Sequence, residues 1–137
     1  MITYQAYTNR SQKEVNQFYR RHGLNVSCHG QDTIWIARAE QEIIASLFIR
    51  YYHVAEAEPS MLLRSLFVAP AYRGLGIGSD LVDNICKDVN GLLSTLCQSD
   101  LVDFYQNFGF EPKLASPDCP LAWQKEIKKG LVLMQRP

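Results

Sequence analysis

Residues 66–78 read Leu66-Phe67-Val68-Ala69-Pro70-Ala71-Tyr72-Arg73-Gly74-Leu75-Gly76-Ile77-Gly78. The apolar start is typical of a buried strand, and Pro70 ends the strand because proline cannot donate to a strand ladder. Residues 79–89 repeat apolar side chains on one helical face, so the glycine-rich turn leads directly into a helix. Glycines before a helix N-terminus leave backbone N–H groups open to an anion, and the helix dipole favours negative charge there. This stretch therefore predicts a phosphate-binding loop.

Three phosphate-binding motifs compete for this loop, and their spacing separates them. Counting on from Gly74, the chain lacks the Gly-Lys pair of a P-loop, and a dinucleotide fingerprint would need a third glycine where Ser79 stands. The remaining pattern is Arg-x-x-Gly-x-Gly at Arg73, Gly76 and Gly78, behind Val-x-Pro. This pattern resembles the acyl-CoA signature of the GCN5-related N-acetyltransferase (GNAT) superfamily. The alternative is a glycine-rich turn that binds no ligand.

A second motif lies further along the chain, at Phe104-Tyr105-Gln106-Asn107-Phe108-Gly109-Phe110. Ser99 or Asp100 can cap a helix here, and Gly109 can end it. Phe-Tyr, three residues and Gly-Phe resemble the other diagnostic motif of the superfamily. The resemblance implies that Tyr105 lies near the thioester sulfur and gives a proton to the leaving thiolate. The alternative is an aromatic core cluster, and we expect both to hold, with packed phenylalanines and a working tyrosine.

The resemblance covers the chain from about residue 30 to the end, and it implies an α/β (α+β) fold whose mixed, mostly antiparallel sheet is flanked by helices. In this fold the two central strands splay apart and admit the pantetheine arm of acetyl-CoA, the co-substrate. We expect backbone hydrogen bonds to that arm at the end of the strand, as in β-augmentation. The expected cofactor-binding residues are Phe67, Val68, Arg73, Gly74, Leu75, Gly76, Ile77, Gly78, Ser79, Gln98, Phe104 and Tyr105.

The predicted activity is acetyl transfer from acetyl-CoA to a primary amine of a small molecule, by direct attack on the thioester. A protein N-acetyltransferase and a catalytically silent acyl-CoA sensor remain as alternatives. The sequence departs from the family pattern at two positions, because Arg64 stands where many members have a strand carboxylate and Gln98 replaces a frequent asparagine. We therefore assign the base to Glu58, Glu56 or His53 in the loop before the strand, acting through water, with Glu58 favoured. Arg64 either binds a substrate carboxylate or forms a salt bridge across the sheet.

The composition fits one domain, residues 1–137, with a small-molecule partner. The chain has 137 residues, of which 47% are hydrophobic, and its 14 basic residues balance its 14 acidic ones. Such a balance provides no basic field for nucleic acid and no polybasic patch for a membrane. The N-terminus lacks the features of a signal peptide, so we expect a cytoplasmic protein. A homodimer stays open.

The cysteines and histidines carry no metal-ligand pattern. Cys28, Cys86, Cys97 and Cys119 contain no Cys-x-x-Cys pair, and the three histidines have no mutual ligand spacing, so no metal site is expected. We expect reduced thiols, with Cys86 and Cys97 packed and Cys119 exposed near the site.

The remaining segments predict an order of strands and helices that agrees with this fold. Apolar periodicity predicts strands at 3–7, 33–38, 43–51, 61–68, 93–97 and 131–134, and helices at 11–20, 79–89 and 121–128, besides the helix around Tyr105. Ser11 and Glu14 match a capping box at the start of the first helix. The strands on either side of 40–42 read as a hairpin.

Overall fold

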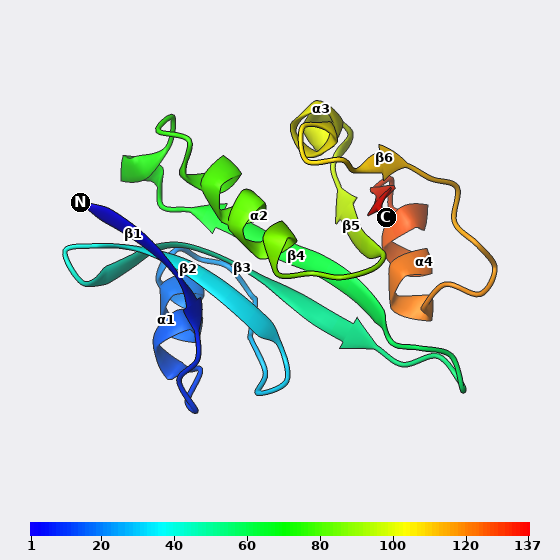
Figure 1. The fold of residues 1–137 in the computed structure, drawn as a ribbon, viewed down its shortest axis with the longest axis horizontal. Helices are drawn as coiled ribbons and strands as arrows, with labels where there is room; N and C mark the ends of the chain where they lie inside the picture. The colour runs from blue at the N-terminus through cyan, green and yellow to red at the C-terminus, as the bar shows by residue number, and fades with distance from the viewer. The chain divides into compact units, whose positions relative to one another are not determined.

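The computed structural model describes residues 1–137, which form a seven-stranded mixed sheet flanked by four α-helices (Figure 1). The strands are β1 (Ile2–Tyr7), β2 (Thr33–Ala39), β3 (Glu42–Tyr52), β4 (Ser60–Val68), β5 (Leu93–Cys97), β6 (Glu111–Pro112) and β7 (Val132–Arg136). The α-helices are α1 (Lys13–Arg21), α2 (Ile77–Lys87), α3 (Val102–Gln106) and α4 (Leu121–Lys128), and short 3-10 helices cover Pro70–Tyr72 and Ser99–Leu101. The strand order is β1-β2-β3-β4-β5-β7-β6. The predicted fold class and every predicted strand and helix are confirmed, with ends that differ by a few residues, and β6 is an addition.

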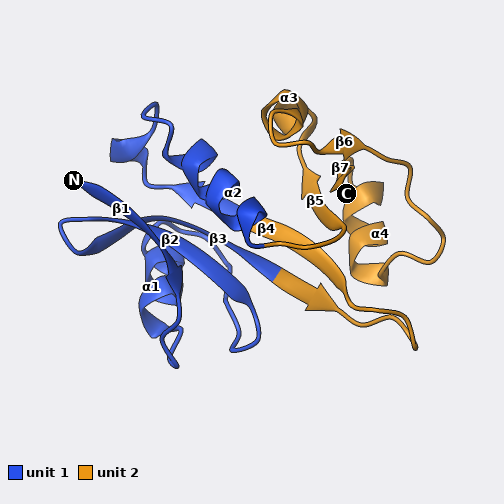
Figure 2. Ribbon diagram, in the orientation of Figure 1, with its two compact units in different colours: residues 1–49, 65–88 blue, residues 50–64, 89–137 orange.

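The chain divides into two compact units, which Figure 2 draws in different colours. Unit 1 comprises 1–49 and 65–88, and unit 2 comprises 50–64 and 89–137. The division cuts through β3 and β4, so each unit holds a part of both strands. The prediction of a single domain stays a prediction.

Unit 1 is a three-layer arrangement of α1, the strands β1 to β3, and α2 (Figure 1). Val15, Phe18 and Tyr19 of α1 are fully buried against one face of these strands, where Ile36 and Phe48 complete the core. On the opposite face α2 buries the apolar side of its helix, as the spacing of its residues predicted. The two faces alternate along β2 because successive strand residues point in opposite directions.

The turn between β2 and β3 uses two residues with positive φ, Glu40 at 51° and Gln41 at 73°. Ala39 pairs with Glu42 across the turn, so these two residues alone connect the strands. A two-residue turn with positive φ at both positions matches the right-handed twist of the strands. The predicted hairpin is confirmed, and its turn is one residue shorter than 40–42.

The predicted capping box at the start of α1 is wrong. The N-cap residue is Gln12, without a side-chain capping bond, and the Ser11 hydroxyl accepts a hydrogen bond from the Lys13 amide at 3.2 Å. Glu14 instead accepts two hydrogen bonds from Arg38 of β2, at 2.6 and 2.8 Å. The bidentate pair binds the carboxylate more strongly than one backbone amide would, so it draws Glu14 away from the helix end.

Unit 2 packs α4 on one face of β4, β5 and β7. Leu62, Trp123 and Leu133 form the buried centre of this packing, with Leu96 and Ile127 against it. β4 and β5 run parallel, but their pairing joins only Met61, Leu62 and Leu63 to Leu93, Ser94 and Thr95. Ser65 lies two residues after the last paired residue of β4 and has a φ of 62°. This left-handed conformation interrupts the regular strand. The splay predicted for the central strands thus begins after three paired residues of each.

The Glu14–Arg38 pair makes the stability of the fold depend on pH. Its hydrogen bond with Arg38 lowers the pKa of Glu14, so the pair stabilises the fold above the unfolded pKa of glutamate and loses this effect as the pH falls through the folded pKa. The Glu14 side chain is 43% exposed, so solvent screening limits the effect. We expect Glu14→Gln to lower the free energy of unfolding by about 0.5 to 1 kcal/mol at neutral pH.

Denaturant unfolding at several pH values measures this effect, and the difference between the two proteins should vanish in acid. Glu126→Gln is the control, because its pair with Lys129 is exposed and longer, at 3.5 Å. An equal cost for both variants would contradict the prediction.

Candidate active site

The glycine-rich loop of unit 1 has the backbone that an anion site requires. Gly74 and Gly76 have φ of 80° and 79°, in the left-handed region that favours glycine. Gly76 is the N-cap of α2, and the first amide bonded within the helix is that of Asp80, to the Gly76 carbonyl at 3.0 Å. The amides of Ile77, Gly78 and Ser79 therefore have no hydrogen-bond acceptor within the helix. The loop presents them at the positive end of the helix dipole.

Arg73 connects this loop to the end of β4 by a hydrogen bond. Its Nε donates a hydrogen bond to the Val68 carbonyl at 2.9 Å, and its guanidinium lies 5.0 Å from the centre of the Phe67 ring. Phe67 in turn packs edge-on against Phe18 of α1, with ring centroids 6.0 Å apart. The Phe67 side chain thus belongs to the core of unit 1, so only its backbone remains for the cofactor contact predicted there. The Val68 carbonyl is already engaged by Arg73.

The first turn of α2 is also tied to β1. Tyr4 donates a hydrogen bond from its hydroxyl to Asp80 Oδ2 at 2.8 Å. Burial, together with this hydrogen bond and the charge of Asp80, raises the pKa of Tyr4 to about 12. The phenol therefore stays protonated and keeps donating over the physiological range. With Arg73 on one side and Tyr4 on the other, both ends of the loop are held.

Tyr105 lies in α3 of unit 2 within an aromatic cluster. Its ring is 5.0 Å from Phe104 and 5.6 Å from Phe110, centroid to centroid, and Phe104 is 5.3 Å from Phe108. Tyr105 is 6% exposed. Gly109 has a φ of 89°, as expected of a residue that ends a helix. The predicted aromatic cluster is confirmed, and the catalytic role of Tyr105 stays a prediction.

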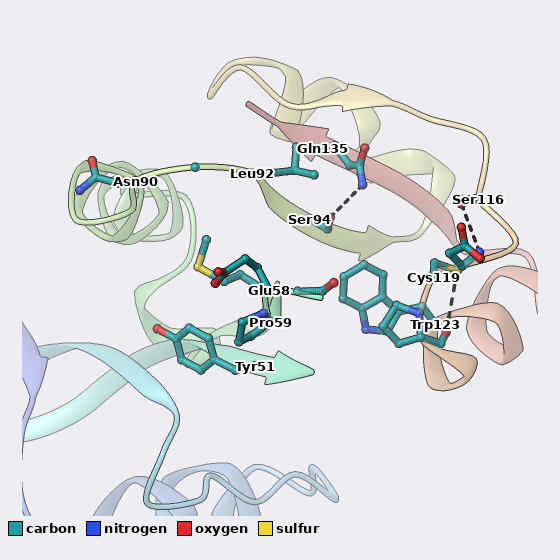
Figure 3. Close-up of a pocket in the computed structure, with 15 residues that line it drawn as sticks. Tyr51, Glu58, Pro59, Asn90, Leu92, Ser94, Ser116, Cys119, Trp123 and Gln135 are labelled. Atoms are coloured by element: carbon teal, nitrogen blue, oxygen red, sulfur yellow. Dashed lines mark hydrogen bonds between the residues drawn. The ribbon is translucent and has the colours of Figure 1, made fainter. Parts of the chain in front are cut away.

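The loop before β4 and the start of α4 line a pocket of about 680 Å³, all within unit 2 (Figure 3). Glu58 enters it from the loop, and Trp123 enters it from α4. Cys119 lines it and is half-buried. Trp123 was not singled out from the sequence, because a tryptophan inside an amphipathic helix signals only a buried face. The pocket makes Glu58 available to a ligand, and its part in proton transfer stays a prediction.

Two positions where the sequence departs from the family pattern are also in unit 2. Arg64 Nη1 donates a hydrogen bond to the Tyr52 hydroxyl at 3.1 Å, and Tyr52 packs edge-on against Trp123 with centroids 5.6 Å apart. Gln98 is exposed directly after β5, where its carbonyl accepts a hydrogen bond from the Leu101 amide at 2.9 Å. The structure thus brings Arg64 together with an aromatic pair beside the pocket.

The predicted site residues divide between the two units. Phe67, Val68 and residues 73–79 belong to unit 1, whereas Glu58, Arg64, Gln98, Phe104 and Tyr105 belong to unit 2. The side chains of the chain form no group of three or more His, Cys, Asp or Glu residues that could hold a metal ion. None of the helices has the length and apolar character to span a membrane.

The family model of the acetyltransferase (GNAT) domain matches residues 30–112, more than half of this chain of 137 residues. The matched part includes the glycine-rich loop and the Phe-Tyr motif. The chain belongs to the GNAT family of acetyltransferases. Among curated proteins, none matches this sequence.

Several solved structures share the fold. Escherichia coli ElaA is 18% identical, with a TM-score of 0.69 over 100% of both chains. A GNAT family acetyltransferase from Elizabethkingia anophelis with acetyl-CoA bound is 12% identical, with a TM-score of 0.62 over 98% of this chain and 97% of that one. N-acetylglutamate synthase from Neisseria gonorrhoeae, complexed with coenzyme A and N-acetyl-glutamate, is 14% identical, with a TM-score of 0.67 over 99% of this chain and 35% of that one. At these identities the likeness concerns the fold alone.

The loop geometry predicts how a side chain at Gly76 affects cofactor binding. Gly76 and Gly130 both have positive φ, at 79° and 104°, and a Cβ atom at either would meet nothing within 4 Å. Gly76→Val and Gly130→Val should therefore lower the melting temperature by similar amounts, through backbone strain of about 1 to 2 kcal/mol. Only Gly76→Val should lose the stabilisation by acetyl-CoA, because its side chain would stand where the loop amides are presented.

Thermal unfolding of the three proteins with and without acetyl-CoA measures both effects. For the unaltered protein, ligand at one hundred times its dissociation constant adds about 2.7 kcal/mol. A normal shift in Gly76→Val would place the phosphate site elsewhere.

Proposed function

We propose that the protein is an N-acetyltransferase that transfers the acetyl group of acetyl-CoA to a primary amine of a small molecule. The observation that carries the proposal is the loop from Arg73 to Ser79, with left-handed glycines at Gly74 and Gly76 and leftover amides at the start of α2. Membership of the GNAT family supports acetyl-CoA as the ligand of this loop. Neighbours of the same fold with coenzyme A or acetyl-CoA bound agree with it.

The proposed reaction is a direct transfer. The neutral amine nitrogen forms a bond to the acetyl carbon, and the carbon–sulfur bond breaks. A backbone N–H at Phe67 or Val68 stabilises the oxyanion that forms between these events. Tyr105 gives its hydroxyl proton to the departing thiolate, and the proton released by the amine passes through water to Glu58. Gln98 and Phe104, on either side of the Tyr105 helix start, complete the cofactor contacts.

Three of the four thiols of the chain are buried, which argues against an acetylated cysteine intermediate at those positions. Burial, aided by the charge of Asp100, raises the pKa of the Cys97 thiol, so very little nucleophilic thiolate forms at neutral pH. Cys28 and Cys86 are buried as well. Holding amine and thioester together can by itself supply a large part of the rate, of the order of 7 to 11 kcal/mol. A direct attack therefore needs no nucleophile from the protein.

The role of Tyr105 is tested by removing its hydroxyl. Tyr105→Phe keeps the ring in contact with Phe104 and Phe110, so the melting temperature and its shift with acetyl-CoA should remain. Turnover should fall by about one to four orders of magnitude, because the thiolate would leave without its proton donor. The measurement is release of free thiol with a panel of amines. Full turnover in this variant would remove Tyr105 from the mechanism.

The same assay separates the proposal from its two alternatives. A silent acyl-CoA sensor would bind acetyl-CoA and release no thiol with any amine. A protein acetyltransferase would release thiol with lysine-bearing or N-terminal peptides and not with small amines. Steady thiol release with a small primary amine is the result that the proposal expects.

A further inference from the structure

The pocket of unit 2 has the size and lining of a small-molecule site. Its volume of about 680 Å³ lies within the usual range for ligand pockets. Much of its surface is apolar, since Tyr51, Met61, Leu92 and Trp123 contribute to it. It opens beside the start of β4 and β5, at the polar pair in which Gln135 donates a hydrogen bond to the Ser94 hydroxyl at 3.1 Å. Figure 3 shows these two residues on the strands and the Trp123 ring entering from α4.

Trp123, which lines the pocket, has a hydrogen-bond donor that is not used. The side chain is 3% exposed, and its indole N–H is buried without a partner. Most buried polar groups in proteins are paired, and an unpaired donor is destabilising. An oxygen atom of a ligand would supply the missing acceptor. Because the indole N–H is covered in the free pocket, a neighbouring side chain has to move when the ligand binds, which is common at binding sites.

The charges that line the pocket have one sign. Its fifteen lining residues include Glu58 and Asp118 and contain no Lys, Arg or His. Arg64 is not among them, and its Nη1 donates to the Tyr52 hydroxyl. Both acids are exposed, so solvent screens them in part, but their charge attracts a cation to the pocket and repels a carboxylate.

We propose that this pocket binds the acceptor of the acetyl group, and that it selects apolar primary amines that carry no carboxylate and have an uncharged oxygen for the Trp123 indole. The charges of Glu58 and Asp118 attract the amine as its ammonium ion, the indole N–H binds the oxygen, and the apolar lining covers the rest of the molecule. The inference rests on the proposed acetyltransferase function and adds the class of the acceptor.

Matched amines test the charge selection. Each amino acid is compared with the amine that lacks its carboxylate: tyrosine with tyramine, tryptophan with tryptamine, and leucine with isopentylamine. In each pair that is turned over, kcat/KM by thiol release should be at least about tenfold higher for the amine without the carboxylate. Tyramine should exceed phenethylamine, which lacks the oxygen. Higher kcat/KM for the carboxylated partners would overturn the inference while leaving the acetyltransferase function intact.

A different result marks failure of the function itself. If acetyl-CoA stabilises the protein and no amine of the panel releases thiol, the proposed function fails and the inference fails with it. If only peptides accept the acetyl group, the proposed function and the inference also fail.

Trp123→Phe tests the indole donor. The variant keeps an aromatic ring and loses the N–H, so KM for the best oxygen-bearing amine should rise about tenfold, with kcat and the KM for acetyl-CoA unchanged. KM for an amine without the oxygen should rise clearly less, because that amine loses only apolar contact with the larger ring. Equal KM values in the variant and the unaltered protein would overturn the pocket assignment.

Fluorescence provides a second measurement that leaves Trp123 in place. The chain has two tryptophans, and Trp35 belongs to unit 1, where its indole donates to Asp88 at 3.1 Å. In Trp35→Phe all indole emission comes from Trp123, and saturation with the acceptor should shift it. Unchanged emission at an acceptor concentration that saturates turnover would overturn the inference, even if Trp123→Phe fails to fold.

Neutralising the acids tests the origin of the selectivity. Combining Glu58→Gln with Asp118→Asn should reduce the preference for amines without a carboxylate by about tenfold. Glu126→Gln is the matched control, because it removes one acid from α4 outside the pocket. An unchanged preference in the double variant would overturn the charge argument, and an equal change in the control would do the same.

Discussion

The left-handed backbone at Gly76 is the constraint on which the site depends. Only glycine adopts a φ of 79° at little cost, and this turn of the chain starts α2 so that three amides remain outside the helical hydrogen bonds. Arg73 and Tyr4 then hold the two sides of the loop, one to β4 and the other to β1. The proposed anion site thus consists of backbone groups, and side chains mainly keep that backbone in place.

Much of the fold could be predicted because its signals are local. The periodicity of α2, the apolar strands and the helix end at Gly109 depend on neighbouring residues, and all appear where expected. The capping box failed because a distant arginine, Arg38, competes for Glu14. The Ser65 carbonyl likewise has a distant partner, since it accepts a hydrogen bond from the Tyr19 hydroxyl of α1 at 2.8 Å. The local sequence does not signal a hydrogen-bond partner that only tertiary packing brings close.

The candidate site likewise contains residues that the sequence could predict and residues that it could not. Residues 73–79 and Tyr105 carry recognisable motifs, because the spacing of glycines and aromatic residues reports a required backbone or contact. Trp123 has no such motif. Its importance arises only when α4 packs on β4 and β7, which buries the ring and leaves the indole N–H without an acceptor. The apolar lining and the absence of cations are likewise properties of residues that are far apart in the chain.

Arg64 on β4 determines which residues can supply negative charge near the pocket. A strand carboxylate at position 64 would have served as base and as the negative charge that attracts an ammonium group. With Arg64 hydrogen-bonded to Tyr52, the negative charge at the proposed acceptor pocket comes from Glu58 and Asp118 instead. Both belong to loops, where side chains are solvated and mobile compared with those on a strand. Under the proposed function, proton removal then runs through water, so the acidity of the amine itself sets the pH range of activity more than any one protein group does.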